Sequence, residues 1–246
     1  LATGIVAAFR KQTNLVEFPL YSDSIFFNNY GGSSAWNTNR YLNIWICDIA
    51  GNIMGWAQFP GGGNSQKDGI VIDFERFGTI GTISQPYHKG RTTTHEVGHW
   101  LNLEHLWGGG WGSCGNDNVS DTPTQEEENY GCPAFPHNAN SCNTTNSDGD
   151  MFMNYMDYSN DGCMNMFTQG QKTRMIAAIN QSRQNLLNHN LCGGGTSDID
   201  ELITSKRALI KIVDILGREV KLPLEKNRTL FYIYDDGTVE KRMLIE

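Results

Sequence analysis

The sequence contains no long apolar run, because no stretch reaches the roughly eighteen consecutive apolar residues that a membrane-spanning helix requires. Its start, LATGIVAAFRKQTN, lacks the basic head and apolar stretch of a secretory leader, so we expect the chain to begin inside a larger precursor. Basic residues are also few: the sequence has 19 Lys and Arg residues and 27 Asp and Glu residues, which gives a formal net charge of -8. This balance argues against nucleic acid or an anionic membrane as the main partner.

Cysteine is sparse, with six residues in 246, and the absence of a C-x-x-C pair weakens a zinc-ribbon interpretation. Four of the six lie between residues 114 and 163, in a region rich in Gly, Asn, Asp and Ser with little apolar material. Crosslinks there suit an oxidising compartment. The other two, Cys47 and Cys192, either form a further bond or remain buried thiols, and spacing alone fixes no pairing.

A dense polar motif, HEVGHWLNLEH, occupies residues 95–105. His95 and His99 are four residues apart, so on a helix their imidazoles lie on one face and can converge on one point. Glu96 stands beside them. In this H-E-x-x-H arrangement two neutral imidazoles bind zinc, and the glutamate can take a proton from a water at the metal. The alternative is a surface helix with scattered polar residues.

A third histidine, His105, lies ten positions after His95. Ten residues rise about 15 Å along a helix, too far for His105 to reach the same point unless the chain turns. Asn102 is the one residue between Trp100 and Glu104 that readily takes the left-handed conformation that ends a helix, so we expect a reversal there. Three imidazoles would leave a fourth zinc position for water, which is typical of a catalytic site.

These residues resemble the elongated zinc signature of the metzincin metallopeptidases, and HEVGHW is similar to its pappalysin branch, which usually has glycine where this chain has Asn102. The segment MFMNYMDYSNDGCMNMFTQGQKTRM, residues 151–175, resembles the pappalysin methionine turn. The resemblance covers roughly residues 3 to 192 and lacks the family's first strands and backing helix. It implies an α+β metzincin-like domain, with a twisted mixed sheet, a zinc helix above the cleft and an irregular lower part, and it places Met156 under the metal and Tyr158 beside it.

The resemblance also implies crosslinks and a calcium site in the lower part. It pairs Cys114 with Cys142 and Cys132 with Cys163. The stretch CGNDNVSDTPTQ resembles the family's calcium loop and supplies hard oxygen ligands. The implied ligands are the side chains of Asp117, Asp121 and Thr122 and the carbonyl of Val119. The alternative is a merely solvated turn.

Three strands are expected before the zinc helix. Residues 41–51 and 52–60 are joined by a tight turn, which predicts antiparallel neighbours, and residues 68–74 are continuously apolar, as in the middle of a sheet. The helix after them has Thr92, Thr93 and Thr94 as candidate N-caps. By resemblance, residues 52–59 form the edge strand of the cleft, where Trp56 and Ala57 would bind an extended peptide by strand addition; the alternative is a plain structural edge.

A last helix is predicted over residues 168–189, with Thr168 and Gln171 as a capping box. It should pack behind the methionine turn, through an apolar stripe of Met175, Ile176, Ile179, Leu186 and Leu187. Some pappalysins favour a basic residue after the scissile bond through acidic groups just past that turn. Asp161 is the candidate here, with Gly162 as the alternative position.

The amino-acid composition of the chain changes after residue 191. We expect a catalytic domain over 1–191, a linker at 192–198 (CGGGTSD) and a small β domain over 199–246, with a hairpin turn at Asp236-Gly237. DILGREVK and FYIYDDGTVEKR resemble a shortened form of the sorting domain of Bacteroidetes type IX secretion substrates. The alternative is a small β accessory module.

The sequence therefore predicts a secreted or cell-surface zinc endopeptidase of a Bacteroidetes-type bacterium, with Glu96 as general base, catalytic Zn2+ and structural Ca2+. Its expected partners are protein or peptide substrates and, through the tail, a secretion machinery. One rival is another zinc peptidase class whose third ligand is Glu126, Glu127 or Glu128. The other is a non-catalytic surface or adhesion protein on a peptidase scaffold.

Overall fold

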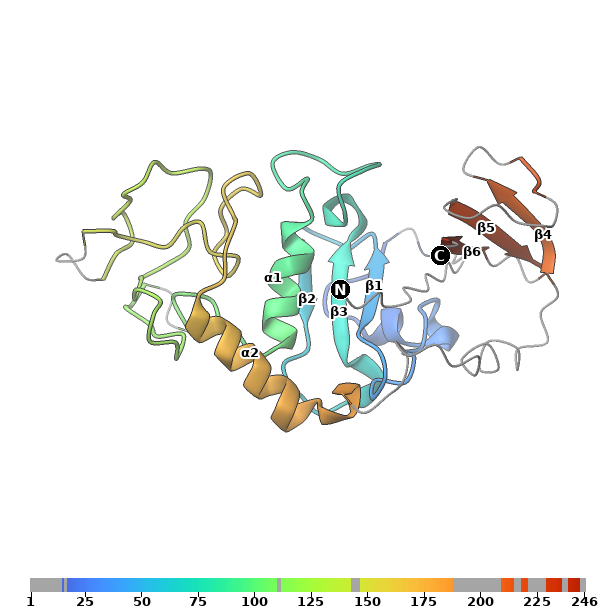
Figure 1. The fold of residues 1–246 in the computed structure, drawn as a ribbon, viewed down its shortest axis with the longest axis horizontal. Coiled ribbons are helices and arrows are strands. Elements are labelled where there is room, and N and C mark those ends of the chain that lie inside the picture. The colour runs from blue at the N-terminus through green and yellow to red at the C-terminus, as the bar shows by residue number, and fades with distance from the viewer. Residues whose placement is uncertain are drawn as a thin grey trace. The chain divides into compact units, whose positions relative to one another are not determined.

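The computed structural model of the protein describes residue 15 and residues 17–109, 112–142, 147–187, 209–214, 218–220, 229–235 and 239–243. The chain divides into two compact units, of which Asn14–Leu187 carries the motifs discussed above and the other carries three C-terminal strands (Figure 1). The predicted linker at 192–198 lies outside the described residues. Among the described residues no helix is long and apolar enough to cross a membrane.

The sheet of the first unit has the strand order β1-β3-β2, with β1 at Asn43–Cys47, β2 at Gly55–Ala57 and β3 at Gly69–Asp73. β1 pairs with β3 in parallel and β2 pairs with β3 in antiparallel. The prediction that the first two strands are direct neighbours was therefore wrong. β3 separates them because its first four residues are buried, and only the middle of a sheet covers a continuous apolar strand on both faces.

The two faces of β3 enter different cores. On one face Ile70 and Ile72 pack with Trp100. On the other face Val71 packs with Trp45 and Phe26, whose rings meet edge to face with centroids 4.9 Å apart. Short 3-10 helices surround this sheet, at Asp23–Phe26, Asn28–Tyr30, Ser65–Lys67 and Phe74–Arg76.

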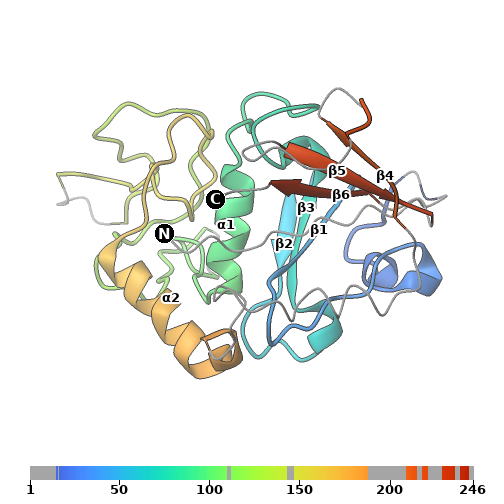
Figure 2. The same ribbon diagram turned by 45° about the vertical axis from the view of Figure 1, so that its right-hand side comes forward.

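The helix α1, Arg91–Trp100, lies between the sheet and the irregular segment that follows it (Figures 1 and 2). Its N-cap is Gly90 with φ 71°, so the prediction that a threonine caps it was wrong. Its C-terminus confirms the predicted reversal, since Asn102 has φ 72°. Leu103 N donates to Gly98 O at 2.9 Å and Asn102 N to His99 O at 2.9 Å, which is the Schellman pattern of a helix end.

The helix α2, Gln169–Ser182, opens with the predicted capping box of Thr168 and Gln171 and is followed by a 3-10 turn at Gln184–Leu187. The predicted stripe is only partly right, because Met175 packs against the core under the histidines whereas Ile176 and Leu187 are exposed.

Beyond the end of α2, Arg183 ties this helix to α1. Its guanidinium lies 3.8 Å from the Trp100 ring centroid, donates to Trp100 O at 3.1 Å and pairs with Asp68.

Disulfides hold the irregular segment after α1, as expected. Cys114 is bonded to Cys142 and Cys132 to Cys163, with Cα atoms 5.6 Å and 5.7 Å apart. Cys47 is a free thiol, and burial, together with the nearby Asp73 and Asp48, raises its pKa to about 12. Cys192 lies outside the described residues.

The second unit contains an antiparallel sheet of order β4-β5-β6, with β4 at Leu209–Asp214, β5 at Thr229–Tyr234 and β6 at Val239–Met243. The buried Asp214 accepts from Arg218 Nε at 2.8 Å and from its backbone N at 3.0 Å. The turn predicted at residues 236 and 237 lies outside the described residues, as do most of the residues on either side of β4.

Candidate active site

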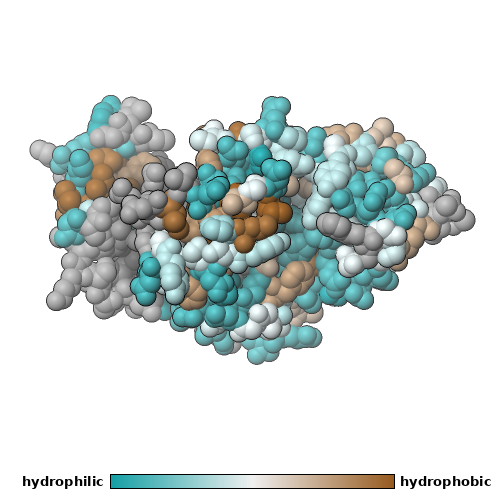
Figure 3. All heavy atoms as spheres, turned by 180° about the vertical axis from the view of Figure 1, so that it is seen from behind, coloured by the Kyte–Doolittle hydropathy of each residue, from teal (hydrophilic) through white to brown (hydrophobic). Residues whose placement is uncertain are grey.

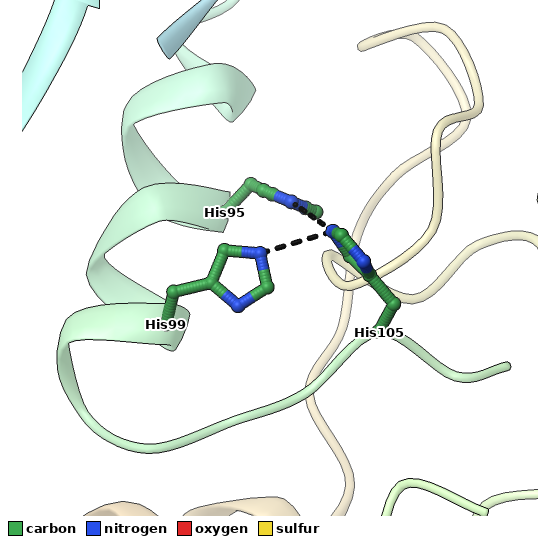
Figure 4. A group of neighbouring side chains, drawn as sticks. All are labelled: His95, His99 and His105. Atoms are coloured by element: carbon green, nitrogen blue, oxygen red, sulfur yellow. Dashed lines mark hydrogen bonds between the residues drawn. The ribbon is translucent and has the colours of Figure 1, made fainter. Parts of the chain in front are cut away.

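Three imidazoles converge where α1 ends (Figure 4). His95 and His99 project from successive turns of α1, and the reversal at Asn102 returns His105 to meet them. His105 Nε2 lies 3.2 Å from His95 Nε2 and 3.0 Å from His99 Nε2. The structure thus confirms the predicted convergence, and among the described residues this is the group able to hold a metal ion.

Backbone carbonyls fix the tautomers of the two helical histidines. His95 Nδ1 lies 2.7 Å from Tyr155 O, and His99 Nδ1 lies 2.7 Å from Leu103 O. A carbonyl only accepts, so Nδ1 carries the proton in both rings and Nε2 presents a lone pair. Lone pairs aimed at one point repel each other, and a cation placed between them removes this cost.

Burial keeps the three rings neutral. It lowers the pKa of His95 well below its usual range, and the neighbouring His99 and His105 lower it further. Burial lowers the pKa of His99 to about 4, and burial with His99 nearby lowers that of His105 to about 3. Neutral imidazole is the form that binds a metal ion.

Glu96 lies on the same helix beside these rings and is 6% exposed. Burial raises its pKa to about 8. Its Oε2 is buried and has no hydrogen-bond partner among the described residues. A buried carboxylate oxygen without a partner is costly, so this atom is suited to a ligand that the described protein groups do not supply, such as a water molecule.

Aromatic and sulfur groups enclose His105. The Tyr158 hydroxyl lies 3.2 Å from His105 Nε2, and the Trp107 ring stacks on the His105 ring with centroids 4.4 Å apart and planes 13° apart. Met156 is fully buried under the helix. A Cβ on Gly98 would come within 2.4 Å of Met156 Sδ, which explains the glycine inside the motif.

Residues 27–180 match the family model of the M43 peptidases, described as Pregnancy-associated plasma protein-A. The chain belongs to this family, the pappalysins. An extracellular metalloprotease of Coccidioides posadasii is 40% identical over 147 residues, which are 58% of this chain and 50% of that protein. One of Sordaria macrospora is 39% identical over 153 residues, or 60% of this chain and 51% of that protein.

Solved pappalysin structures share the fold. Mature mirolysin of Tannerella forsythia in complex with a cleaved peptide is 48% identical, with a TM-score of 0.67, over 71% of this chain and 66% of that chain. Mirolysin in complex with compound 9 is 47% identical, with a TM-score of 0.69, over 75% of this chain and 70% of that chain. These likenesses confirm the metzincin-like α+β fold. The chain spans about half the length of the curated relatives that it matches.

The pappalysin methionine turn is bound to α2 by a pair of buried amides that the sequence did not reveal. Asn154 Nδ2 donates to Gln171 Oε1 at 2.8 Å, and Gln171 Nε2 donates to Asn154 Oδ1 at 3.1 Å. Asn154 Oδ1 also accepts from Met156 N at 2.9 Å, and Gln171 Oε1 accepts from Thr168 N at 2.9 Å. The capping box indicated Gln171, but no local pattern identifies its distant partner.

Asp157 holds the tyrosine side of the same turn. It accepts from Tyr158 N at 2.8 Å and from both the backbone N and the side chain of Asn129, at 2.7 Å and 2.9 Å. Gln125 Nε2 adds a fourth hydrogen bond at 3.1 Å. All of these side chains except that of Tyr158 are buried, so the position of Tyr158 depends on a polar network within the irregular segment.

Asp161 has a structural role in the region that follows the methionine turn. Asp161 is 2% exposed, and its Oδ2 accepts from Lys89 N at 2.6 Å and from Arg91 N at 3.2 Å. It therefore caps the N-terminus of α1, where Gly90 offers no side chain. The selection of a basic substrate residue by Asp161 stays a prediction. Gly162 is exposed, with open space where a Cβ would lie.

Three of the four nominated calcium ligands meet. Thr122 Oγ1 lies 2.8 Å and 2.9 Å from the two carboxylate oxygens of Asp117, and 2.8 Å from Val119 O. The carboxylate of Asp121 is bonded instead to α2, accepting from Thr168 Oγ1 at 2.7 Å and from Gly170 N at 2.9 Å.

The strand β2 lies beside the metal group at the edge of the sheet. A Cβ on Gly55 would be 3.2 Å from Glu96 Cγ, and the Phe59 ring centroid lies 5.1 Å from that of His99. Met54 O and Gln58 N bond to β3, at 2.9 Å and 3.0 Å. Because bonding directions alternate along an antiparallel strand, Gly55 and Ala57 turn their N–H and C=O groups away from β3.

The amide pair predicts that Gln171→Leu destabilises the protein by about 2 kcal/mol or more, since it removes the carbonyl that accepts from Asn154 Nδ2 and from the buried Thr168 N. Urea unfolding followed by circular dichroism measures the loss. Gln169→Leu is the matched control, because Gln169 is exposed on the same turn and should change the free energy of unfolding by no more than about 0.5 kcal/mol. Equal effects of the two substitutions would contradict the role of the pair.

Proposed function

We propose that this chain is the catalytic part of a secreted zinc-dependent endopeptidase. The observation that carries the proposal is the convergence of three neutral ring nitrogens beside a buried carboxylate oxygen without a partner. Membership of the pappalysin family supports it, as does the likeness to extracellular metalloproteases and to mirolysin in complex with a cleaved peptide.

The donor set fits zinc. His95, His99 and His105 would hold the ion through their Nε2 atoms, and imidazole nitrogen is a preferred zinc ligand. Zinc bound at three nitrogens supplies Lewis acidity, which polarises a carbonyl and lowers the pKa of a water molecule. The carbonyls of Tyr155 and Leu103 hold two of the rings in the required tautomer.

The protein groups then perform the proton transfers. Glu96 Oε2 would accept the proton of the attacking water and pass it to the leaving amine, because it is the buried acid beside the three rings. A cation held by those rings would oppose the effect of burial on the pKa of Glu96 and favour the carboxylate, which is the form that accepts a proton. Tyr158, whose hydroxyl lies 3.2 Å from His105 Nε2, would donate a hydrogen bond to the developing oxyanion. Burial raises the pKa of Tyr158, so the hydroxyl keeps its proton near neutral pH.

The two rival functions receive less support. Glu126 and Glu127 are exposed, and Glu128 accepts a hydrogen bond from Tyr130, so none of the three completes the histidine group in the part of the chain that the structure describes. A non-catalytic adhesion protein would have no need of a buried Glu96 without a partner, which costs stability and serves proton transfer.

Glu96→Gln tests the general base. We expect kcat on a peptide substrate to fall by about a hundredfold or more, while the zinc content stays at one ion per chain, because Gln cannot accept the proton. Metal analysis and a chelator-sensitive peptide assay measure the two quantities. Glu104→Gln is the control, since Glu104 contacts Arg174 and Asn118 rather than the histidines. Full turnover by Glu96→Gln would refute the assignment.

His105→Ala tests the third ligand. Loss of a ligand should weaken zinc binding by more than the roughly 10- to 100-fold that loss of a supporting hydrogen bond costs. Competition with a fluorescent zinc chelator gives the affinity. His88→Ala serves as the control, because His88 Nδ1 lies 3.3 Å from Pro86 O in the loop before α1 and the ring is not one of the three that converge. Unchanged zinc affinity in His105→Ala would remove this residue from the site.

We further propose a structural calcium ion at the loop of residues 117–122. The carboxylate of Asp117, the hydroxyl of Thr122 and the carbonyl of Val119 form the cluster of oxygens that supports it. Burial raises the pKa of Asp117, although hydrogen bonds from Thr122 and Val119 oppose this, and a cation would offset the cost of the buried charge.

Calcium should raise the melting temperature of the protein, because a ligand that binds only the folded state stabilises it. Differential scanning fluorimetry with calcium or magnesium measures the shift. Asp117→Asn should abolish the calcium effect, whereas Asp48→Asn, which removes the same charge after β1, should retain it. A shift that is equal in both variants would contradict the site.

We also propose where the protein is located and how its chain divides into domains. The relatives named as extracellular metalloproteases support secretion, and the two disulfides suit an oxidising compartment. We propose a Bacteroidetes-type origin, a catalytic domain over 1–191, and a C-terminal sorting-like domain over 199–246 that addresses the protein to a secretion machinery. The antiparallel sheet β4-β5-β6 is compatible with a small β module.

A further inference from the structure

A cavity of about 220 Å3 lies against the sheet, on the face opposite α1. Its walls include Tyr21, Phe26, Trp56, Gly69 and Val71. It exceeds the roughly 30 Å3 that one water molecule occupies in the liquid, so a whole side chain can enter. In Figure 3, apolar residues gather in brown patches on the surface in view. The cavity adjoins the edge strand β2, since Trp56 and Ala57 line it.

The strand register connects the cavity to the cleft. Gly55 and Ala57 turn their backbone groups outward, and Gly55 faces Glu96 while Ala57 packs in the core under α1. Trp56, between them, points to the opposite face and pairs with Val71. In an extended peptide added to β2, the residue opposite Trp56 therefore places its side chain on the cavity side.

One wall of the cavity is built by a strained residue. Tyr21 has φ 55°, which is uncommon for a bulky residue, and it is 67% exposed. Its ring meets that of Trp56 edge to face, with centroids 5.5 Å apart. Strain of this kind persists where the surrounding structure imposes it and is frequent at ligand sites.

The charged groups at the cavity neutralise each other. Lys67 forms an ion pair with Asp23, and the Lys67 ammonium lies 6.0 Å from the Phe26 ring centroid. Because the two charges are paired with each other, we do not expect them to attract a charged ligand side chain. The recognition chemistry that remains is aromatic, because Tyr21, Phe26 and Trp56 offer ring edges and faces.

We propose that this cavity is a subsite for an aromatic side chain of the peptide substrate, contributed by the residue that pairs opposite Trp56. The proposal rests on the proposed peptidase function only in requiring a peptide along β2. The aromatic preference appears at one position of the peptide, and the residues directly before and after that position face the metal side, because successive side chains of an extended strand point to opposite faces.

The test measures binding separately from cleavage. Labelled peptides that carry Phe at successive positions of an otherwise constant sequence are titrated against the zinc-loaded Glu96→Gln protein by fluorescence anisotropy, with Leu in place of Phe as the comparison. We expect Phe at one position to bind about three- to tenfold more tightly than Leu. Tyr21→Asn, which tolerates the left-handed backbone, should remove this preference. Tyr30→Asn is the matched control, since Tyr30 is 65% exposed and packs on Phe27 instead.

The outcomes separate the two proposals. A Phe preference that depends on Tyr21 supports the subsite even if the unaltered protein cleaves none of these peptides, a result that would count against the peptidase alone. Cleavage without a Phe preference, an equal preference for Leu, or a preference that survives Tyr21→Asn overturns the subsite and leaves the peptidase in place. Absence of peptide binding overturns the subsite as well.

Discussion

The site depends on two hydrogen bonds from imidazole to backbone carbonyl. Tyr155 O and Leu103 O each accept from an Nδ1–H, and by doing so they turn the Nε2 lone pairs of His95 and His99 toward one point. The two carbonyls come from different places. Leu103 belongs to the reversal that ends α1, whereas Tyr155 belongs to the methionine turn some fifty residues later, so the metal group forms only when the helix and the turn are docked together.

That docking is achieved with few apolar side chains. The core under the histidines consists of Leu103, Leu106, Trp107 and Met156, and the segment around it is held by polar contacts and two disulfides. Asn154 and Gln171 join the turn to α2, and Asp157 joins it to residues 125–129. Such networks fix geometry more strictly than apolar contacts do, because each buried group must find its own partner.

Residues distant in the sequence accept hydrogen bonds from the N-termini of both α-helices. Asp161 caps α1 from beyond the methionine turn, and Asp121 accepts from the first turn of α2. The capping of α1 is thus a tertiary contact. For this reason the local sequence, with Thr92, Thr93 and Thr94, did not predict where the helix begins.

The parts of the molecule that local chemistry determines were predictable from the sequence. The zinc motif, the left-handed Asn102 and the capping box of α2 each rest on residues close in the chain, and the structure contains all three. Family resemblance supplied the disulfide pairs, which spacing could not. The partners of Asn154 and Asp157 were not predictable, because an amide or a carboxylate in an irregular segment carries no periodic signal of what it will meet.

The strand order, which differs from the predicted pairing of β1 with β2, determines which backbone groups of β2 face outward. Because β3 lies between β1 and β2, β2 is the outermost strand of the described sheet and pairs in antiparallel along one edge only. Met54 and Gln58 direct their backbone hydrogen bonds toward β3. Because these directions alternate along the strand, Gly55 and Ala57 present their backbone groups outward. A slip of one residue would reverse every side chain, placing Trp56 against Glu96, where a Cβ on Gly55 would already meet Val71 O at 2.7 Å. The apolar middle strand therefore determines both the register at the metal site and which peptide side chains can reach the opposite face.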